Sequence, residues 1–259
     1  MNVQWPNQAF IGPSEGDATV VNELAERVNG VRETIARAAD RAGRDPNAVT
    51  LVAVSKTFGS AQVVEAARLG LRHFGENRVQ EAADKIPAVA SELTATGPPP
   101  IWHLIGHLQS NKARLAVSLF SVVESVDSLA LATTLDRLAQ QRSQPLDVLV
   151  EVNVGREASK SGFLPEELPA VFPGLWALPR LRIRGLMTVA PVVVQAEDAR
   201  PYFRELRRLR DELLAREPAR ELPELSMGMT GDYPVAIEEG ATIVRVGRAI
   251  FGERPTPAT

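Results

Sequence analysis

The feature that most constrains this fold is a regular alternation of short apolar runs with amphipathic segments. Strand-like runs occur at Thr50–Ser55, Leu71–Phe74, Trp102–Ile105, Ser121–Ser125, Asp147–Val154, Leu181–Val189, Glu224–Ser226 and Ile243–Val246. Helix-like stretches lie between them, for example Ala61–Leu69, Ser128–Gln141 and Pro201–Ala215. Eight strands with interleaved helices predict a closed, parallel (β/α)₈ barrel, a fold of about 250 residues. An open, doubly wound sheet is the alternative.

The ends of the chain differ from this repeat. Apolar residues from Val21 to Ala38 recur at steps of three and four, which predicts an extra N-terminal helix that Gly43 and Pro46 close. Residues 1–17 are polar and rich in Pro and Gly, so we expect a loose leader. We expect one domain over residues 18–254, with Thr96–Pro100 as a loop insertion, and a frayed tail at 255–259.

Composition excludes several classes of function. The chain has 259 residues, a formal net charge of -3, no cysteine and three histidines. A global basic field for nucleic acid or an anionic membrane is therefore absent, and thiolate chemistry and Cys-ligated metal sites are excluded. The N-terminus does not resemble a signal peptide, and no apolar run is long enough to span a bilayer. We expect a soluble cytoplasmic protein without a metal site.

Lys56 is the first candidate functional residue, because it ends the apolar run that begins at Leu51. Burial disfavours an ammonium group and favours the neutral amine, a nucleophile suited to forming a Schiff base with an aldehyde. A lysine that extends its amine to water is the more frequent explanation for such a position taken alone.

The last two predicted strand ends indicate an anion site. Ser226 and Thr230 offer hydroxyl donors, and Gly228 and Gly247 allow backbone N–H groups to approach a phosphate. Phosphate sites in such barrels commonly lie after strands seven and eight, and Asp232 is placed to cap the following helix. Two ordinary glycine turns would explain the same composition.

A lysine amine and a phosphate cradle at one barrel mouth together suggest pyridoxal 5′-phosphate, which carries an aldehyde and a phosphate. Arg245, inside the last strand, is a candidate partner for the pyridine nitrogen. Because a guanidinium stays protonated, it would leave that nitrogen unprotonated and the ring a weak electron sink. His103 is either a neighbour of the cofactor or a histidine satisfied within the core.

Six stretches resemble the pyridoxal-phosphate homeostasis protein family, in the right order along roughly residues 20–254. They are Leu51–Thr57, His73–Glu81, Trp102–Lys112, Ser159–Gly162, Arg184–Met187 and Leu225–Gly252. The resemblance implies an alanine-racemase-type barrel that binds pyridoxal phosphate as a Schiff base on Lys56. It also implies a cofactor site that includes Asn77, Ser226, Thr230, Arg245, Gly247 and the backbone amide of Arg248. His103 and Met227 are further candidates for the cofactor site. Arg248 departs from the small hydroxyl residue that many members carry.

Two functions from different classes follow. The resemblance implies a binding protein for intracellular cofactor homeostasis, without catalytic residues, with apo-enzymes that use pyridoxal phosphate as candidate recipients. The alternative is a pyridoxal-phosphate-dependent amino-acid racemase. Racemases of this barrel type take a catalytic tyrosine from a second domain, for which we expect no room in this chain. A cofactor-free phosphate-sugar isomerase leaves Lys56 and Arg245 unexplained. We expect a monomer or weak dimer.

Overall fold

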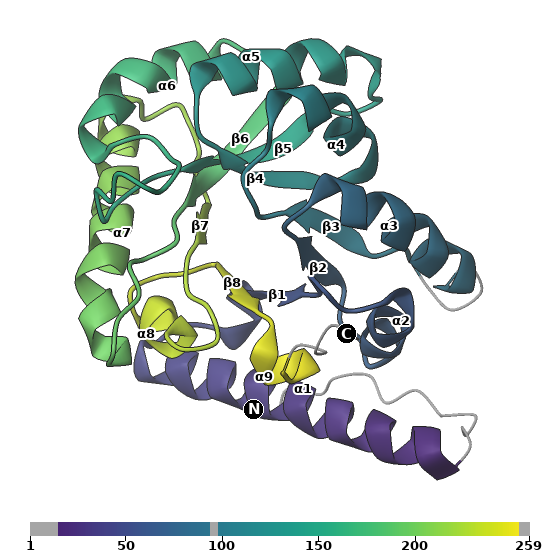
Figure 1. Cartoon of the computed structure of the whole chain (residues 1–259). Coiled ribbons are helices and arrows are strands. Elements are labelled where there is room, and N and C mark those ends of the chain that lie inside the picture. Colours follow the sequence, from purple (N-terminus) through teal and green to yellow (C-terminus); the bar gives the residue numbers. More distant parts are fainter. Residues whose placement is uncertain (1–14, 94–97, 254–259) are drawn as a thin grey trace.

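The fold is a closed parallel barrel, as the sequence predicts. The computed structural model describes residues 15–93 and 98–253, and its strands follow one another around the barrel in sequence order, from β1 to β8 and back to β1 (Figure 1). The strands are β1 (Thr50–Val54), β2 (His73–Glu76), β3 (Ile101–Leu104), β4 (Val122–Val126), β5 (Leu146–Glu151), β6 (Leu181–Met187), β7 (Glu224–Ser226) and β8 (Ile243–Val246). The open doubly wound sheet is thereby excluded.

Helices form the outer ring around the strands (Figure 1). The α-helices are α1 (Glu15–Arg41), α2 (Ser60–Arg68), α3 (Val79–Leu93), α4 (Ala113–Leu119), α5 (Leu129–Leu138), α6 (Leu168–Trp176), α7 (Arg200–Arg216), α8 (Tyr233–Glu238) and α9 (Arg248–Phe251). Short 3₁₀ helices lie at η1 (Pro46–Ala48), η2 (Ser110–Lys112), η3 (Ala139–Gln141), η4 (Pro165–Glu167) and η5 (Ala196–Ala199).

The extra N-terminal helix is confirmed as α1, which packs against α8 and α9 and touches α2. Its buried positions Leu24, Val28, Val31 and Ile35 form one apolar stripe at helical spacing. Helix α8 spans only Tyr233–Glu238, and α1 lies along the outer side of α8 and α9 at the part of the barrel formed by β8 and β1 (Figure 1). The predicted leader lies outside the described residues up to position 14, and α1 begins at Glu15; the predicted tail also lies outside them.

Two apolar regions hold the barrel. The larger one fills the space between strands and helices, and a small one of Val52, Leu149, Met187 and Ile243 fills part of the barrel interior. The rest of the interior carries buried polar side chains, among them His103, Glu124 and Arg245. A barrel of this size is packed by its own side chains, so these polar groups must satisfy one another.

Strand ends were the least accurate part of the sequence prediction. The bounds of β7 and β8 agree, whereas β5 ends at Glu151 and β6 at Met187, before the predicted Val154 and Val189. The apolar residues beyond these ends are buried by loop packing, which hydrophobicity alone does not distinguish from a strand. Strand β2 lies two residues later than predicted and includes Glu76, a buried carboxylate with partners from other elements.

Candidate functional site

Lys56 lies two residues after the end of β1, at the end of the barrel where the carboxyl termini of the strands lie. Its side chain is half-buried, and the next residue, Thr57, has a left-handed backbone with φ of 72°. Such a φ is unfavourable for a β-branched residue and persists where surrounding contacts hold it. The turn that carries Lys56 is therefore constrained by its neighbours.

Those contacts come from a group of charges that we call the turn cluster, which consists of the buried Glu76 and Lys85 and the partly exposed Glu81. The Lys85 ammonium donates to Glu76 Oε1 at 2.6 Å, to Glu81 Oε1 at 3.0 Å and to the backbone carbonyl of Ser55 at 2.8 Å. Glu76 Oε1 also accepts from the Ser55 hydroxyl at 2.7 Å. The amide of Thr57 donates to Glu81 Oε1 at 2.6 Å. Burial raises the pKa of Glu76, opposed by its bonds with Lys85 and Ser55.

The ends of β2 and β3 lie close together beside this turn. Asn77 is half-buried and follows β2, and Gly106 lies just beyond the end of β3. A Cβ on Gly106 would lie 2.4 Å from the carbonyl oxygen of Asn77, so only glycine fits there. This close approach brings Asn77 to the mouth of the barrel.

A second polar group, which we call the interior cluster, lies inside the barrel and consists of His103, Glu124, Ser226 and Arg245. Arg245 Nη1 donates to the Ser226 hydroxyl at 2.5 Å, and that hydroxyl donates to Glu124 Oε2 at 2.5 Å. His103 Nδ1 lies 2.6 Å from Glu124 Oε1. All four side chains are buried, so the cluster joins strands β3, β4, β7 and β8 from within.

The interior cluster is charged. Burial opposes ionisation of Glu124, but the hydrogen bond and charge of His103, with Arg245 and Ser226, lower the pKa of this carboxyl overall. Burial lowers the pKa of Arg245, against the charges of Glu124, Glu151 and Asp232, yet a guanidinium remains protonated at neutral pH. The ionised Glu124 makes His103 Nδ1 a donor. His103 Nε2 lies 3.0 Å from Nδ1 of His73.

The loops after β7 and β8 meet at the predicted phosphate position. The amide of Arg245, within β8, donates to the carbonyl of Gly228 at 3.0 Å, which joins the loop after β7 to the strand that precedes Gly247. Gly228 has φ of 92°, and a Cβ there would lie 2.6 Å from the Cβ of Ala236. Among the described residues, the amides of Thr230, Gly231, Gly247 and Arg248 donate to no protein acceptor. These N–H groups are available to an anion.

The structure corrects one expectation in this loop. Asp232 precedes α8, but its carboxylate makes no capping bond to that helix. It accepts from the amide of Met229 at 2.6 Å instead, because the loop turns back over the helix start. Asp232 thus shapes the loop that carries Thr230.

The predicted site residues fall into three sets. Lys56, Asn77, Thr230 and Gly247 lie at strand ends and are half-buried, while the side chain of Arg248 is exposed. His103, Ser226 and Arg245 are joined through Glu124 inside the barrel. Met227 is fully buried in the core between strands and helices. The register Val52↔Arg245 between β1 and β8 brings the strand of Lys56 against that of Arg245.

Residues 28–255 match the profile of the alanine racemase N-terminal domain. The pyridoxal phosphate homeostasis protein of Aquifex aeolicus is 45% identical over 229 residues, which cover 88% of this chain and 97% of that protein. The protein of the same name from Escherichia coli K12 is 42% identical over 237 residues, which cover 90% and 98%. This chain belongs to the pyridoxal phosphate homeostasis protein family.

Solved structures place this family member among similar barrels. PipY of Synechococcus elongatus PCC7942, a structure with PLP bound, is 41% identical with a TM-score of 0.76, and the match covers 88% of this chain and 100% of PipY. Alanine racemase of Clostridium difficile 630 has a TM-score of 0.64 at 15% identity, covering 91% of this chain and 58% of that chain. The latter likeness concerns the fold alone.

Sequence reasoning missed several residues around this site of the homeostasis-family barrel. Glu124 interrupts an apolar strand, a signal that was visible in the sequence, and so does Glu151 at the end of β5. Burial, with the charge of Asp127, raises the pKa of Glu151 to about 7. Glu76, at the end of β2, is a further buried carboxylate, and it forms a salt bridge with Lys85 on α3 at 2.6 Å.

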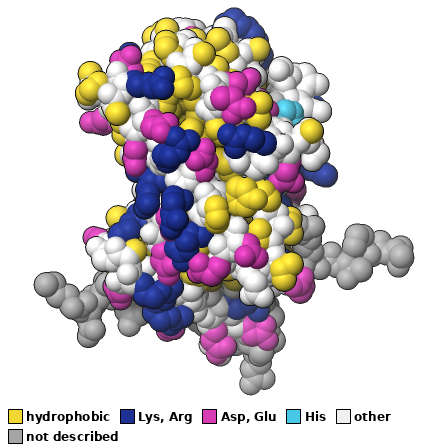
Figure 2. Space-filling model, turned by 90° about the vertical axis from the view of Figure 1, so that its left-hand side faces the viewer, with side chains coloured by type: hydrophobic (Ala, Val, Ile, Leu, Met, Phe, Trp, Pro, Cys, Tyr) yellow, Lys and Arg dark blue, Asp and Glu magenta, His cyan; other side chains and the backbone are white. Residues whose placement is uncertain are grey.

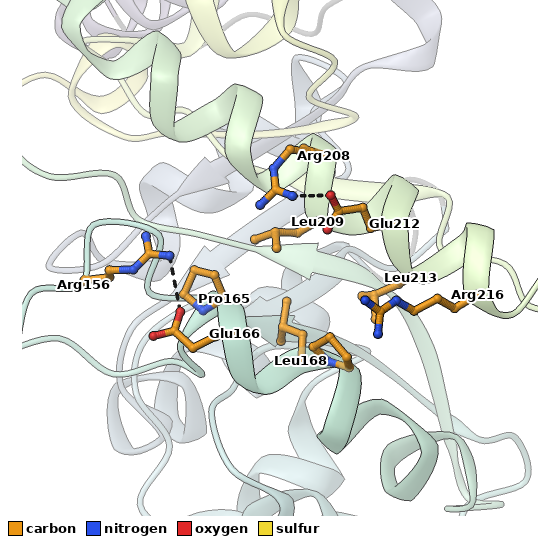
Figure 3. A pocket seen from close by; sticks show the side chains of 10 residues that line it. Arg156, Pro165, Glu166, Leu168, Arg208, Leu209, Glu212, Leu213 and Arg216 are labelled. Carbon is orange, nitrogen blue, oxygen red and sulfur yellow. Dashed lines mark hydrogen bonds and ion pairs between the residues drawn. The ribbon is translucent and has the colours of Figure 1, made fainter.

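A surface pocket of about 190 Å³ lies elsewhere, on the outer wall between η4, α6 and α7 (Figure 3). Its rim carries ion-paired side chains, including Arg156 with Glu166 and Arg208 with Glu212. Figure 2 shows the face of α7, where dark blue basic side chains alternate with acidic ones. The arginines of α7 thus form the solvated face of an amphipathic helix. The lining of the pocket includes neither Lys56 nor any residue of the loops after β7 and β8.

Two classes of site or segment are absent from the described residues. Residues 15–93 and 98–253 contain no group of three or more His, Cys, Asp or Glu side chains arranged to hold a metal ion. Over the same ranges, no helix combines the length and apolar character that a membrane crossing requires.

Proposed function

We propose that this protein binds pyridoxal 5′-phosphate on Lys56 and acts in the homeostasis of that cofactor in the cytoplasm. The observation that carries the proposal is the pairing of β1 with β8. It sets β1, which is followed two residues later by Lys56, beside β8, which contains Arg245 and is followed by Gly247. The names of the relatives and the PLP-bound PipY structure support the choice of cofactor.

The donor set fits the phosphate. Amides of Thr230, Gly231, Gly247 and Arg248 have no acceptor among the described residues, and a phosphate accepts hydrogen bonds from such groups. A Cβ on Gly247 would lie 3.2 Å from the carbonyl oxygen of Val54, so glycine keeps the β8 loop against β1. The hydroxyl of Thr230 adds a further donor, and Arg248 is free in its exposed position to add charge.

Arg245 and Lys56 serve the other two parts of the cofactor. The bonds of Arg245 to Ser226 and to the carbonyl of Thr188 use two of the five guanidinium N–H groups, which leaves donors for an unprotonated ring nitrogen. Bound pyridoxal phosphate supplies an electrophilic aldehyde, with which the Lys56 amine forms a Schiff base and releases water. Asn77 and His103 complete the proposed surroundings, with Met227 behind the phosphate loop.

A binding role suits this constellation better than the racemase alternative. The ring-nitrogen partner is a guanidinium, which supports carbanion chemistry poorly. The likeness to alanine racemase stands at 15% identity and covers 58% of that chain, so it carries the fold and no activity. No catalytic residue is assigned. We propose that residues 18–254 form a single binding domain and that the protein is a monomer or weak dimer. Light scattering can distinguish these two oligomeric states.

Borohydride reduction tests the covalent part. The purified protein should take up pyridoxal phosphate with a yellow absorption band, and reduction should fix the cofactor on the peptide that contains Lys56. The Lys56→Ala variant should bind without this covalent link. A wild-type protein that ignores added pyridoxal phosphate contradicts the proposal.

Two further measurements distinguish a protein that carries the cofactor from an enzyme that uses it. Transfer of the cofactor to a defined apo-enzyme should exceed the rate of its release into solution if apo-enzymes are recipients. Loss of the α-proton of alanine or serine, much faster than with free cofactor, would support the racemase. The Ser226 hydroxyl, predicted as a phosphate donor, is instead bonded to Glu124 and Arg245, so the cradle is tested at Thr230 alone. The Thr230→Ala variant should bind pyridoxal phosphate more weakly, and unchanged affinity would contradict the role of this hydroxyl.

A further inference from the structure

The turn cluster touches the main chain on both sides of Lys56. The carbonyl of Ser55 belongs to the peptide group that precedes Lys56, and it accepts from Lys85 at 2.8 Å. The amide of Thr57 belongs to the peptide group that follows Lys56, and it donates to Glu81 at 2.6 Å. Both peptide planes that flank the Cα of Lys56 are therefore held by side chains of α3.

The two bonds are linked into one unit. Lys85 bridges Glu76 and Glu81, with its ammonium 2.6 Å and 3.0 Å from their Oε1 atoms. Glu76 in turn accepts from the Ser55 hydroxyl at 2.7 Å, which fixes the residue before Lys56 a second time. Lys85 and Glu76 are buried, so water does not compete for these bonds.

The backbone of Thr57 is strained, and the turn cluster keeps it in this conformation. Its φ of 72° lies in the left-handed region, where a threonine is strained. The turn has no glycine at this position to adopt that conformation without cost. The bond from the Thr57 amide to Glu81 offsets the strain, so loss of Glu81 should let the turn relax and change the direction of the Lys56 side chain.

We propose that Glu81 and Lys85 are positioning residues that orient Lys56 toward the cofactor aldehyde by fixing its two flanking peptide groups. The inference rests on the proposed function, in which the Lys56 amine reacts with that aldehyde. Orientation of a reacting group governs the rate at which it reacts, more than the affinity for parts of the ligand bound elsewhere. The turn cluster should thus affect capture at Lys56 and spare the phosphate loops after β7 and β8.

The test uses the Glu81→Ala variant, because Glu81 is the most exposed member of the cluster, with a side chain 29% exposed. Glu81→Gln keeps an oxygen that can accept from Thr57, and Asp84→Ala removes an exposed carboxylate from the same helix as a control. Three properties are measured: hydrogen exchange at the Thr57 amide without cofactor, the rate of borohydride-trapped capture at Lys56, and the affinity for pyridoxine 5′-phosphate, an alcohol that cannot form the covalent link.

In the Glu81→Ala variant, the hydrogen of the Thr57 amide should exchange faster. The variant should also capture pyridoxal phosphate about tenfold more slowly, an effect of the size expected when a reacting group loses its orientation. Its affinity for pyridoxine 5′-phosphate should stay within about twofold of wild type, since the phosphate loops are untouched. Glu81→Gln should recover most of the capture rate, and Asp84→Ala should match wild type in all three measurements.

Two results overturn the proposal. The first is a Glu81→Ala variant that captures pyridoxal phosphate at the wild-type rate. The second is an equal loss of capture rate and of affinity for pyridoxine 5′-phosphate in this variant, which indicates a general structural defect. A melting curve checks folding. If Glu81→Ala does not fold, Lys85→Arg replaces it. Slower capture by Lys85→Arg with wild-type exchange at the Thr57 amide, or wild-type capture with faster exchange, contradicts the mechanism. Failure of the wild-type protein to capture the cofactor refutes the proposed function of Lys56 instead, so the two failures are distinct.

Discussion

The two sides of the barrel mouth achieve local order in different ways. On the β7–β8 side, Gly228 adopts φ of 92° without a side chain to resist it, and the loops present backbone N–H groups. On the β1–β2 side, Thr57 adopts φ of 72° and Glu81 holds it there. One side is shaped by the absence of side chains and the other by a buried network, so substitutions should affect them differently.

The charged clusters differ as well. The interior cluster joins side chains of four strands to one another, whereas the turn cluster also bonds to the backbone on both sides of Lys56. The interior cluster holds charged side chains in place, and the turn cluster holds a backbone conformation. The stability of the protein should therefore depend more on the interior cluster, and the reactivity of Lys56 more on the turn cluster.

The largest effect is expected at Glu124. Glu124→Ala leaves the buried Arg245 without its carboxylate partner, which should lower the free energy of unfolding by about 3–5 kcal/mol. Glu124→Gln should cost less, because it keeps hydrogen-bonding atoms. Urea unfolding checks both. Glu65→Ala, in a pair with Arg68 on the outer helix α2, should cost less than about 1 kcal/mol. Similar losses for Glu124→Ala and Glu65→Ala would contradict the stabilising role of the interior cluster.

The next largest effect on stability is expected at Gly228, which can be compared with Gly231 in the same loop. Gly228→Ala should lower the free energy of unfolding by about 2–4 kcal/mol, because its φ is left-handed and its Cβ would lie 2.6 Å from Ala236 Cβ and 2.9 Å from Tyr233 Cα. Gly231→Ala is the matched control, since its Cβ would meet nothing within 4 Å. Thermal unfolding compares the two variants. Equal stability would mean that the loop on the β7–β8 side adjusts freely.

The next prediction concerns the carboxyl group of Glu151. Neighbouring groups compensate its negative charge less fully than His103, Arg245 and Ser226 compensate that of Glu124. The folded pKa of Glu151, about 7, lies above the ordinary value of 4.5, through burial and the charge of Asp127, against Arg245 and His107. The folded chain therefore holds the proton more tightly, and this contribution to stability is present below about pH 4.5 and is lost as the pH rises through 7.

In Glu151→Gln this dependence disappears. Relative to wild type, the variant should gain on the order of 2 kcal/mol between pH 4 and pH 8, allowing for partial exposure of the side chain. Urea unfolding of both proteins at several pH values measures the difference. A difference that does not change with pH would show that Glu151 titrates normally in the folded protein.

The smallest effect on stability is expected at Thr57. Thr57→Gly relieves the left-handed strain but adds conformational freedom to the unfolded chain, so the net change in unfolding free energy should stay below about 1 kcal/mol. Thermal unfolding measures it beside Gly228→Ala. A loss above about 2 kcal/mol would mean that the Thr57 side chain itself supports the turn, and that the contrast between the two sides is overstated.

The sequence by itself determined the barrel, the extra helix and the positions of Lys56, Gly228, Arg245 and Gly247 at or near strand ends. These follow from hydrophobic periodicity and from residue types with narrow conformational or chemical roles. Glu124 was visible as a charge in an apolar strand, although its partners were not.

Only the tertiary structure decided which polar groups meet. Lys85 lies thirty positions from Ser55, and Glu124 lies 102 positions from Ser226, yet each pair forms a hydrogen bond. Likewise, the left-handed conformation of Thr57 has no signature in the residue type. Local pattern sets the backbone path of each element, but partners for buried charges depend on how elements pack, since burial makes an unpaired polar group costly wherever it lies in the chain.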